Sequence, residues 1–273
     1  MDYRSRYKQE VSKYGKKDAI IALCVYPVLV AITLALFVIF QTFEFTGLLA
    51  SIFQFSLPAI TIGIVFTIVL VKKQGLASIG LHKDRVWQML RFSFFIILFY
   101  SAFGVVPGLI NGWEFNNFGA LIPILITTII LAVFEDIFFV GYLQTRLYGL
   151  VKKNALAIFA GATLFALIHI PVDVYIGARG IELVALQIGR IIMHLAFVLI
   201  FRRHFSLIPV SIAHTLSNFF GNGDLWRESD FDVIGTWATI ATLLILVILV
   251  TGEIVHWRRS KREEGEKHNE ISR

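Results

Sequence analysis

The segment GALIPILITTIILAVFEDIFFVGYL, residues 119–143, is an almost continuous run of apolar residues that contains two adjacent acids, Glu135 and Asp136. It is longer than the ~20 residues that an α-helix needs to cross the ~30 Å hydrocarbon core of a bilayer. A carboxylate inside hydrocarbon is costly and is usually retained for a function. The segment therefore predicts a transmembrane helix that carries functional acids.

The rest of the chain has the composition of a membrane protein. Hydrophobic residues make up 57% of the 273 residues and charged residues only 16%, a balance that a soluble domain of this length does not need. Eight stretches are apolar enough to be membrane helices: residues 19–40, 47–71, 92–110, 119–143, 155–170, 181–201, 206–221 and 233–255. The sequence lacks the alternating pattern of barrel strands, so it predicts an all-α, polytopic integral membrane protein with about eight transmembrane helices in one bundle.

The basic residues predict the orientation of these helices. Twenty-two of the 25 Lys and Arg residues fall on the side of the N-terminus, the other side holds Arg179 and Arg227, and Arg190 lies inside a span. This positive-inside pattern predicts a multi-pass protein of the cell membrane with both termini in the cytoplasm. The net charge of +6 then reflects topology and an anionic inner leaflet, and nucleic acid is not expected as a partner.

The domain organisation is simple, because no linker rich in Pro, Gly or Ser divides the spans. We expect one membrane domain at residues 19–256, with a core that carries the motifs at about residues 120–221. A basic cytoplasmic tail, residues 1–18, and a charged tail, residues 257–273, should flank it in solvent. Cys24 is the only cysteine, which excludes a disulfide framework or a thiolate metal cluster within one chain.

Two further apolar spans carry polar residues at helical spacing. FALIH places Phe165 and His169 four residues apart, and HTLSN does the same for His214 and Asn218, so each pair shares a helix face. A single buried histidine is most often a core residue, but these polar groups together with Glu135 favour a shared functional cavity. Counting along the spans places Glu135 near the inner side and His169 at an outer end, so convergence requires one span to start earlier, bend or tilt.

Two other polar residues fall inside spans. Arg190 is the only basic residue assigned to one, and we expect it to face the bundle interior, toward the acidic pair or a water-filled pocket beside it. His194, in RIIMHLAF, is not part of a comparable motif. We expect it to be a buried hydrogen-bonding residue without a catalytic role.

The order of these motifs resembles the CAAX-protease and bacteriocin-processing (CPBP) family of intramembrane endopeptidases, which includes Ras-converting-type CAAX endopeptidases. The family motifs are EExxxR with an adjacent FRG-type sequence, FxxxH, and HxxxN or a close variant. In this chain they read EDIFFVG, FALIH and HTLSN. The resemblance implies that Glu135 and His169 activate a water molecule and that His214 and Asn218 stabilise the oxyanion at the scissile carbonyl.

The first motif departs from the family pattern. The second acid is Asp136, and the motif arginine is replaced by Val140. Residues 136 and 140 are four apart, so the family pair would form a salt bridge along one helix face. Asp136 must therefore be protonated, hydrated or paired elsewhere, with Arg190 as the expected substitute cation.

The predicted function is an intramembrane endopeptidase that hydrolyses a peptide bond of a membrane-anchored substrate, prenylated or not. A carboxylate base, an imidazole and neutral donors can hydrolyse an acyl bond without a covalent nucleophile or a cofactor. Zn²⁺ held by Glu135, His169 and His214 is the alternative chemistry, and it is not favoured because the HExxH pairing of zincins is missing. The alternative functions are a catalytically impaired homologue that acts as a membrane binding or scaffold protein and, with no inverted repeat to support it, a small transporter.

Overall fold

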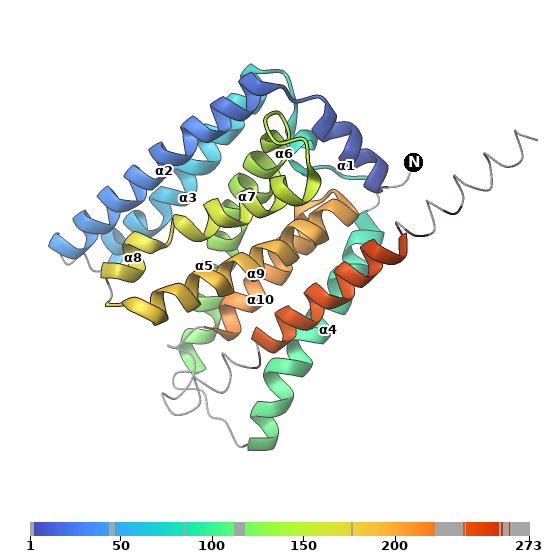
Figure 1. The fold of residues 1–273 in the computed structure, drawn as a ribbon. Coiled ribbons are helices and arrows are strands. Elements are labelled where there is room, and N and C mark those ends of the chain that lie inside the picture. The colour runs from blue at the N-terminus through green and yellow to red at the C-terminus, as the bar shows by residue number, and fades with distance from the viewer. Residues whose placement is uncertain are drawn as a thin grey trace, which may run out of the picture.

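A computed structural model describes residues 3–43, 47–84, 86–111, 118–175, 177–221, 237, 239–256, 258 and 262. All regular secondary structure within these ranges is helical, which confirms the all-α prediction. Figure 1 shows helices α2 and α3 along one edge of the bundle and α4 near the opposite edge, with α5, α9 and α10 between them.

The described helices follow the predicted spans closely. In chain order they are α1 (Tyr3–Ser12), α2 (Lys16–Phe43), α3 (Gly47–Val71), the 3₁₀ turn η1 (Leu76–Ile79), α4 (Val86–Asn111), the 3₁₀ turn η2 (Phe118–Ala120), α5 (Leu121–Glu135), the π-helix η3 (Asp136–Leu143), α6 (Gln144–Leu147), α7 (Asn154–Leu167), α8 (Ile170–Tyr175), α9 (Gly180–His204) and α10 (Leu207–Phe220). A further helix covers Thr239–His256.

The length and apolar character of the helices fit a bilayer. Among the described residues, five helices are long and apolar enough to cross it: Lys16–Phe40, Leu121–Leu147, Asn154–Tyr175, Gly180–His204 and Thr239–His256. Three shorter apolar helices correspond to the remaining predicted stretches: Phe55–Val71, Val86–Ala102 and Leu207–Phe220. Large apolar side chains such as Phe95 and Ile122 lie on the outside, 60% and 71% exposed, where lipid would cover them. The chain is therefore a polytopic membrane protein.

Helix α10 lies at the centre of the bundle. It packs against α4, α5, α9 and η3, while α7 packs against α9 and α3 packs against α5. Tyr100 of α4 bonds Thr242 of the last described helix at 3.1 Å, which joins that helix to the same core. The three predicted motifs lie on α5 and η3, on α7, and on α10, so the packing brings them into one interior.

The acidic motif falls where an α-helix becomes a π-helix. Residues Leu121–Leu147 form one continuous span that includes η3, and every residue of η3 is buried. Gly141 allows this segment to pack directly against η1, because a Cβ atom there would lie 2.7 Å from the Ile79 carbonyl oxygen. Since π-helical turns are rare and occur often at functional sites, this segment marks the region of interest.

The first residues of the chain are packed rather than solvated. Helix α1 contacts α6 and α9, and Tyr7 is only 2% exposed. Its ring meets Tyr148, Phe201 and Phe205 edge to face. The expectation of a solvated tail over residues 1–18 therefore does not hold for α1, because the helix has an apolar face to bury. The predicted tail at 257–273 lies outside the described residues except for 258 and 262.

A buried arginine joins α6 to the N-terminal helices. Arg146, which follows the predicted span of residues 119–143, is 0% exposed. Its Nη1 and Nη2 atoms donate to Ser78 O, Ser78 Oγ, Gly141 O, Thr145 Oγ1 and Gln74 Oε1 at 2.6–3.3 Å. The rings of Tyr14 and Tyr142 lie 4.3 and 4.7 Å from the guanidinium carbon. We call this group, with Arg146 at its centre, the Arg146 cluster.

Candidate active site

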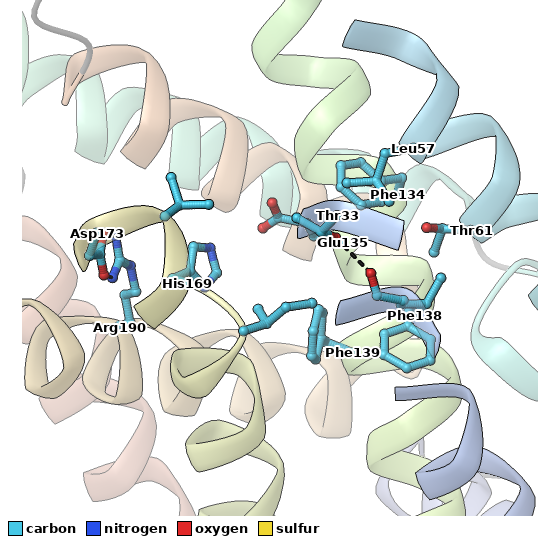
Figure 2. A pocket seen from close by; sticks show the side chains of 13 residues that line it. Thr33, Leu57, Thr61, Phe134, Glu135, Phe138, Phe139, His169, Asp173 and Arg190 are labelled. Atoms are coloured by element: carbon cyan, nitrogen blue, oxygen red, sulfur yellow. Dashed lines mark hydrogen bonds and ion pairs between the residues drawn. The ribbon is translucent and has the colours of Figure 1, made fainter. Parts of the chain in front are cut away.

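One pocket inside the bundle gathers polar side chains from five helices and one turn. Its cavity volume is about 150 Å³, and its polar lining residues are Thr33, Thr61, Glu135, His169, Asp173 and Arg190. The remaining lining residues are apolar: Leu29, Leu57, Phe134, Phe138, Phe139, Ile168 and Val172. We call it the Glu135 pocket, and Figure 2 shows its labelled side chains.

Helix lengths explain how Glu135 and His169 reach the same depth. The span of Glu135 continues to Leu147, 12 residues further on, and the span of His169 begins at Asn154, 15 residues before it. At 1.5 Å per residue, Glu135 lies about 18 Å from the end of its span and His169 about 22 Å from the start of its own, and both ends are on the same side of the bundle. His169 lies within its span rather than at the end, because helix α8 continues it to Tyr175. The apparent difference in depth came from predicted spans that were too short.

The backbone fixes the tautomer of His169, which lies in the turn between α7 and α8. Its Nδ1 is 2.8 Å from the carbonyl oxygen of Phe165, and a carbonyl can only accept. Nδ1 therefore carries the hydrogen, and Nε2 of the neutral ring is an acceptor. The Phe165 ring packs against His169 with centroids 5.0 Å apart. The FxxxH motif thus orients the imidazole through both the backbone and the ring of its phenylalanine.

His214 stands between the two acids. Its Nδ1 is 3.0 Å from Oδ1 of Asp136, and its Nε2 is 3.6 Å from Oε2 of Glu135. The ring is 1% exposed and packs against Phe197, with centroids 4.6 Å apart. The partner of Asp136 is therefore an imidazole from α10. This contact gives Oδ1 of Asp136 a partner in place of the motif arginine, while Oδ2 is buried without a partner among the described residues.

Arg190 faces the predicted pocket but pairs with a different acid. Its Nη1 and Nη2 both donate to the carboxylate of Asp173, the second at 2.8 Å. Arg190 thus borders the same pocket as Glu135, which was one of the two predicted positions, but the acid it pairs with is Asp173 on α8. Its role as a substitute for the motif arginine stays a prediction. Val140, which occupies the arginine position, is 0% exposed within the apolar core.

Asp173 is a pocket residue that the sequence interpretation missed. It lies four residues after His169, the spacing that places two residues on one face of a continuing helix. That signal was hidden because the predicted span ended before Pro171, yet proline is well tolerated in the first turn of a helix such as α8.

Not every predicted residue lines the Glu135 pocket. His214 reaches it only through its contact with Glu135, and Asn218, which is half-buried on α10, does not line it either. The roles of both residues stay predictions. His194 is 0% exposed and stacks on Phe165 with centroids 4.6 Å apart. Neither of its ring nitrogens has a hydrogen-bond partner among the described residues. The expected hydrogen bond of His194 is thus absent from this part of the chain.

The alternative of a metal site depends on the acidic and imidazole side chains described above. Among the residues that the structure describes, no group of three or more His, Cys, Asp and Glu side chains is arranged to hold a metal ion. This includes Glu135, His169 and His214, the three metal ligands considered from the sequence. The expectation of a reaction without a cofactor stays a prediction.

The fold and the pocket define a polytopic membrane protein with acids and imidazoles gathered in its interior. Comparison with known families narrows this class: residues 116–220 match the family model described as type II CAAX prenyl endopeptidase Rce1-like. The segment with all three motifs is therefore similar to CAAX-type intramembrane endopeptidases, which confirms the resemblance predicted from those motifs. No curated protein and no solved structure matches the chain.

Proposed function

We propose that this chain is an intramembrane endopeptidase that hydrolyses a peptide bond of a membrane-anchored substrate with water activated by Glu135 and His169. One observation carries the proposal. Glu135 and His169 line the same pocket inside a membrane bundle, and His214 lies 3.6 Å from the Glu135 carboxylate. A base and an orienting imidazole at one cavity, with a second imidazole in contact with the base, are groups that can carry out acyl hydrolysis.

The first step of the reaction is a proton transfer from water. Glu135 takes the proton, while the acceptor atom Nε2 of His169 orients the water. The hydroxide oxygen then bonds to the scissile carbonyl carbon, and the carbonyl electrons move to oxygen. When this tetrahedral intermediate collapses, the C–N bond breaks and Glu135 returns the proton to the leaving amine. No covalent enzyme intermediate is needed.

The contact between His214 and Asp136 sets a condition for stabilising the oxyanion. A neutral imidazole that donates from Nδ1 to Asp136 has no hydrogen on Nε2. His214 can donate to an oxyanion through Nε2 only if the ring is doubly protonated or if Asp136 holds the proton of their shared bond. The pair of Asp136 and His214 is thus proposed to act as one unit that stores a proton near the reacting carbonyl.

The substrate class follows from the family match and the location of the pocket. In a CAAX sequence a prenylated cysteine precedes two aliphatic residues and the last residue of the chain. We propose that such a membrane-anchored C-terminal peptide, prenylated or not, enters the Glu135 pocket from the bilayer. The basic side of the chain, with both termini, is proposed to face the cytoplasm.

Peptide cleavage by the purified protein tests this function. The full chain in lipid nanodiscs would be incubated with membrane peptides in farnesylated and unmodified forms, and the products identified by mass spectrometry. We expect hydrolysis by the wild type and a loss of ~10²- to 10⁴-fold in Glu135→Ala and His169→Ala. Glu182→Gln, a change on α9 away from the Glu135 pocket, is the control. Wild-type rates in Glu135→Ala would exclude the mechanism, and activity that requires added Zn²⁺ would move the site to the metal class.

A second candidate function is peptide binding without hydrolysis. The observation that favours it is the buried, apolar Val140 at the position of the motif arginine. A protein of this kind would bind the peptides in the same nanodiscs but release them uncleaved, with no difference between the wild type and Glu135→Ala.

A further inference from the structure

Arg190 is the accessible member of a fixed ion pair. Its two terminal nitrogens hold both oxygens of Asp173, and Gln187 donates to the same carboxylate at 2.7 Å. The side chain of Asp173 is 4% exposed, whereas that of Arg190 is 22% exposed. The acid is therefore sealed, and it orients a guanidinium that borders the open space of the Glu135 pocket (Figure 2).

This guanidinium has donors to spare. An arginine side chain carries five N–H groups in a planar fork, and the contact with Asp173 uses two. The hydrogen bonds that Arg190 makes within the described ranges go to Asp173 alone. The side edge of the fork can therefore bind an additional oxygen, a geometry that suits a carboxylate or a carbonyl group.

The other polar groups of the pocket are less suited to that task. Thr33 already donates to the Leu29 carbonyl at 2.8 Å, and Glu135 and Nε2 of His169 are acceptors. The Thr61 hydroxyl has no partner among the described residues, but it is a single donor on a side chain that is only 1% exposed. A peptide backbone that enters an apolar pocket within the bilayer brings carbonyl oxygens, and each costs several kcal/mol if it is left without a donor. Arg190 supplies accessible N–H groups for such an oxygen, and in Figure 2 it lies on the other side of His169 from Glu135.

We infer that Arg190, oriented by Asp173 and Gln187, is a substrate-binding residue that holds a main-chain oxygen of the peptide in the Glu135 pocket. The oxygen belongs either to the terminal carboxylate or to an internal carbonyl. The peptide as ligand rests on the proposed function. The binding site itself does not require that the peptide be cleaved.

Peptide affinity tests this inference separately from cleavage. The probe is a fluorescein-labelled, S-farnesylated peptide ending in Cys-Val-Ile-Met, prepared as the free acid and as the C-terminal amide. Its Kd is measured by fluorescence anisotropy on the full chain in nanodiscs, with Glu135→Gln in every sample to prevent turnover.

Arg190→Met alone would leave Asp173 buried without a cation, so the test variant is the double change Asp173→Asn with Arg190→Met. Asp173→Asn alone retains the guanidinium, and Arg203→Met makes the same arginine change elsewhere on α9.

The inference predicts that the double variant weakens binding about tenfold, the effect of one hydrogen bond to a charged group. Asp173→Asn should weaken binding less than the double variant, because the guanidinium is still present but is held less firmly, and Arg203→Met should retain the affinity. A larger loss for the free acid than for the amide assigns the oxygen to the terminal carboxylate, and equal losses assign it to an internal carbonyl. Equal affinity of the double variant and Arg203→Met would overturn the inference, as would a loss in Asp173→Asn as large as in the double variant. If the wild type binds through Arg190 but does not cleave, the proposed hydrolysis fails and this binding site remains.

Discussion

Two arginines inside one membrane bundle have opposite surroundings. Arg146 is 0% exposed, donates to five oxygens and lies between two tyrosine rings. Arg190 binds one acid and borders a cavity. The first cluster is closed around its cation, and the second leaves donors and acceptors facing open space. A buried charge that is enclosed by its partners holds the fold together, whereas one that faces a cavity is available to a ligand.

The comparison has a physical basis in the cost of polar groups in apolar surroundings. In the Arg146 cluster the bonded oxygens come from η1, from the loop before it and from the π-helix, so one side chain ties these segments together. In the Glu135 pocket, Glu135 and Nε2 of His169 retain accepting capacity. Such capacity is stable inside a membrane only where water or a ligand can satisfy it. The two regions should therefore respond differently to substitution.

The largest expected effect is loss of activity without loss of stability. His169→Ala removes the acceptor that orients water, and we expect cleavage to fall ~10²- to 10⁴-fold. Thermal unfolding in detergent should change little, because His169 is only half-buried and its ring bonds a single backbone carbonyl. The measurement is the cleavage rate together with the unfolding midpoint. A large drop in the midpoint would show that the pocket is also structural and would break the comparison.

Arg146→Met should show the reverse pattern. The change removes the guanidinium that donates to Ser78 and Gln74, and we expect the free energy of unfolding to fall by about 3 kcal/mol. Folded protein should cleave at nearly the wild-type rate. Unfolding in detergent, followed by tryptophan fluorescence, gives the first quantity, and activity per folded molecule gives the second. Lys152→Met, at an exposed basic residue, is the matched control, and an unfolding midpoint equal to that control would contradict a structural role for Arg146.

Asp136→Asn tests the acid behind His214. The amide oxygen can still accept from Nδ1 of His214, so the fold should persist, but the charge that holds the imidazole is lost. We expect cleavage to fall up to ~10²-fold, the cost of a small misplacement of a reacting group. The cleavage rate over a range of pH values is the measurement. An unchanged rate at every pH would show that Asp136 is a passive member of the core.

The smallest effect is expected for Asn218→Ala. Asn218 does not line the Glu135 pocket, so its loss should lower cleavage less than about tenfold. Removal of a true oxyanion donor costs about 10²- to 10³-fold in kcat. A loss in kcat of that size would show that α10 turns Asn218 into the pocket when substrate binds, which would sharpen the account of the site.

The sequence predicted the fold well because its signals are strong and local. Eight apolar stretches and the bias of basic residues suffice to predict a helical membrane bundle. The boundaries were less accurate at α6 and α8, where helices continue past expected ends. The helix at the N-terminus was also missed, although Tyr7, Val11 and Tyr14 recur at helical spacing and are all buried. The many charged residues around them concealed that apolar face.

The sequence predicted that Glu135 and His169 share a cavity, which the structure bears out, but it did not predict the residues around them. Three motifs sufficed to propose Glu135, His169 and His214, because polar residues in apolar spans stand out. The contact between Asp136 and His214 joins residues 78 apart in the sequence, and no local pattern reports such a pairing. The ion pair of Arg190 with Asp173 was missed for the same reason, and the π-helix has no sequence signature of its own.

The most direct test of the account is a single comparison of the wild type with Glu135→Gln. Both proteins, purified in nanodiscs, would be given the farnesylated free-acid peptide, and cleavage, peptide Kd and the unfolding midpoint would be measured on the same preparations. We expect the wild type to release the terminal fragment, and Glu135→Gln to bind the peptide and unfold at the same temperature while cleaving at least ~10²-fold more slowly. Equal cleavage rates in the two proteins would contradict the assignment of the Glu135 pocket as the site of hydrolysis.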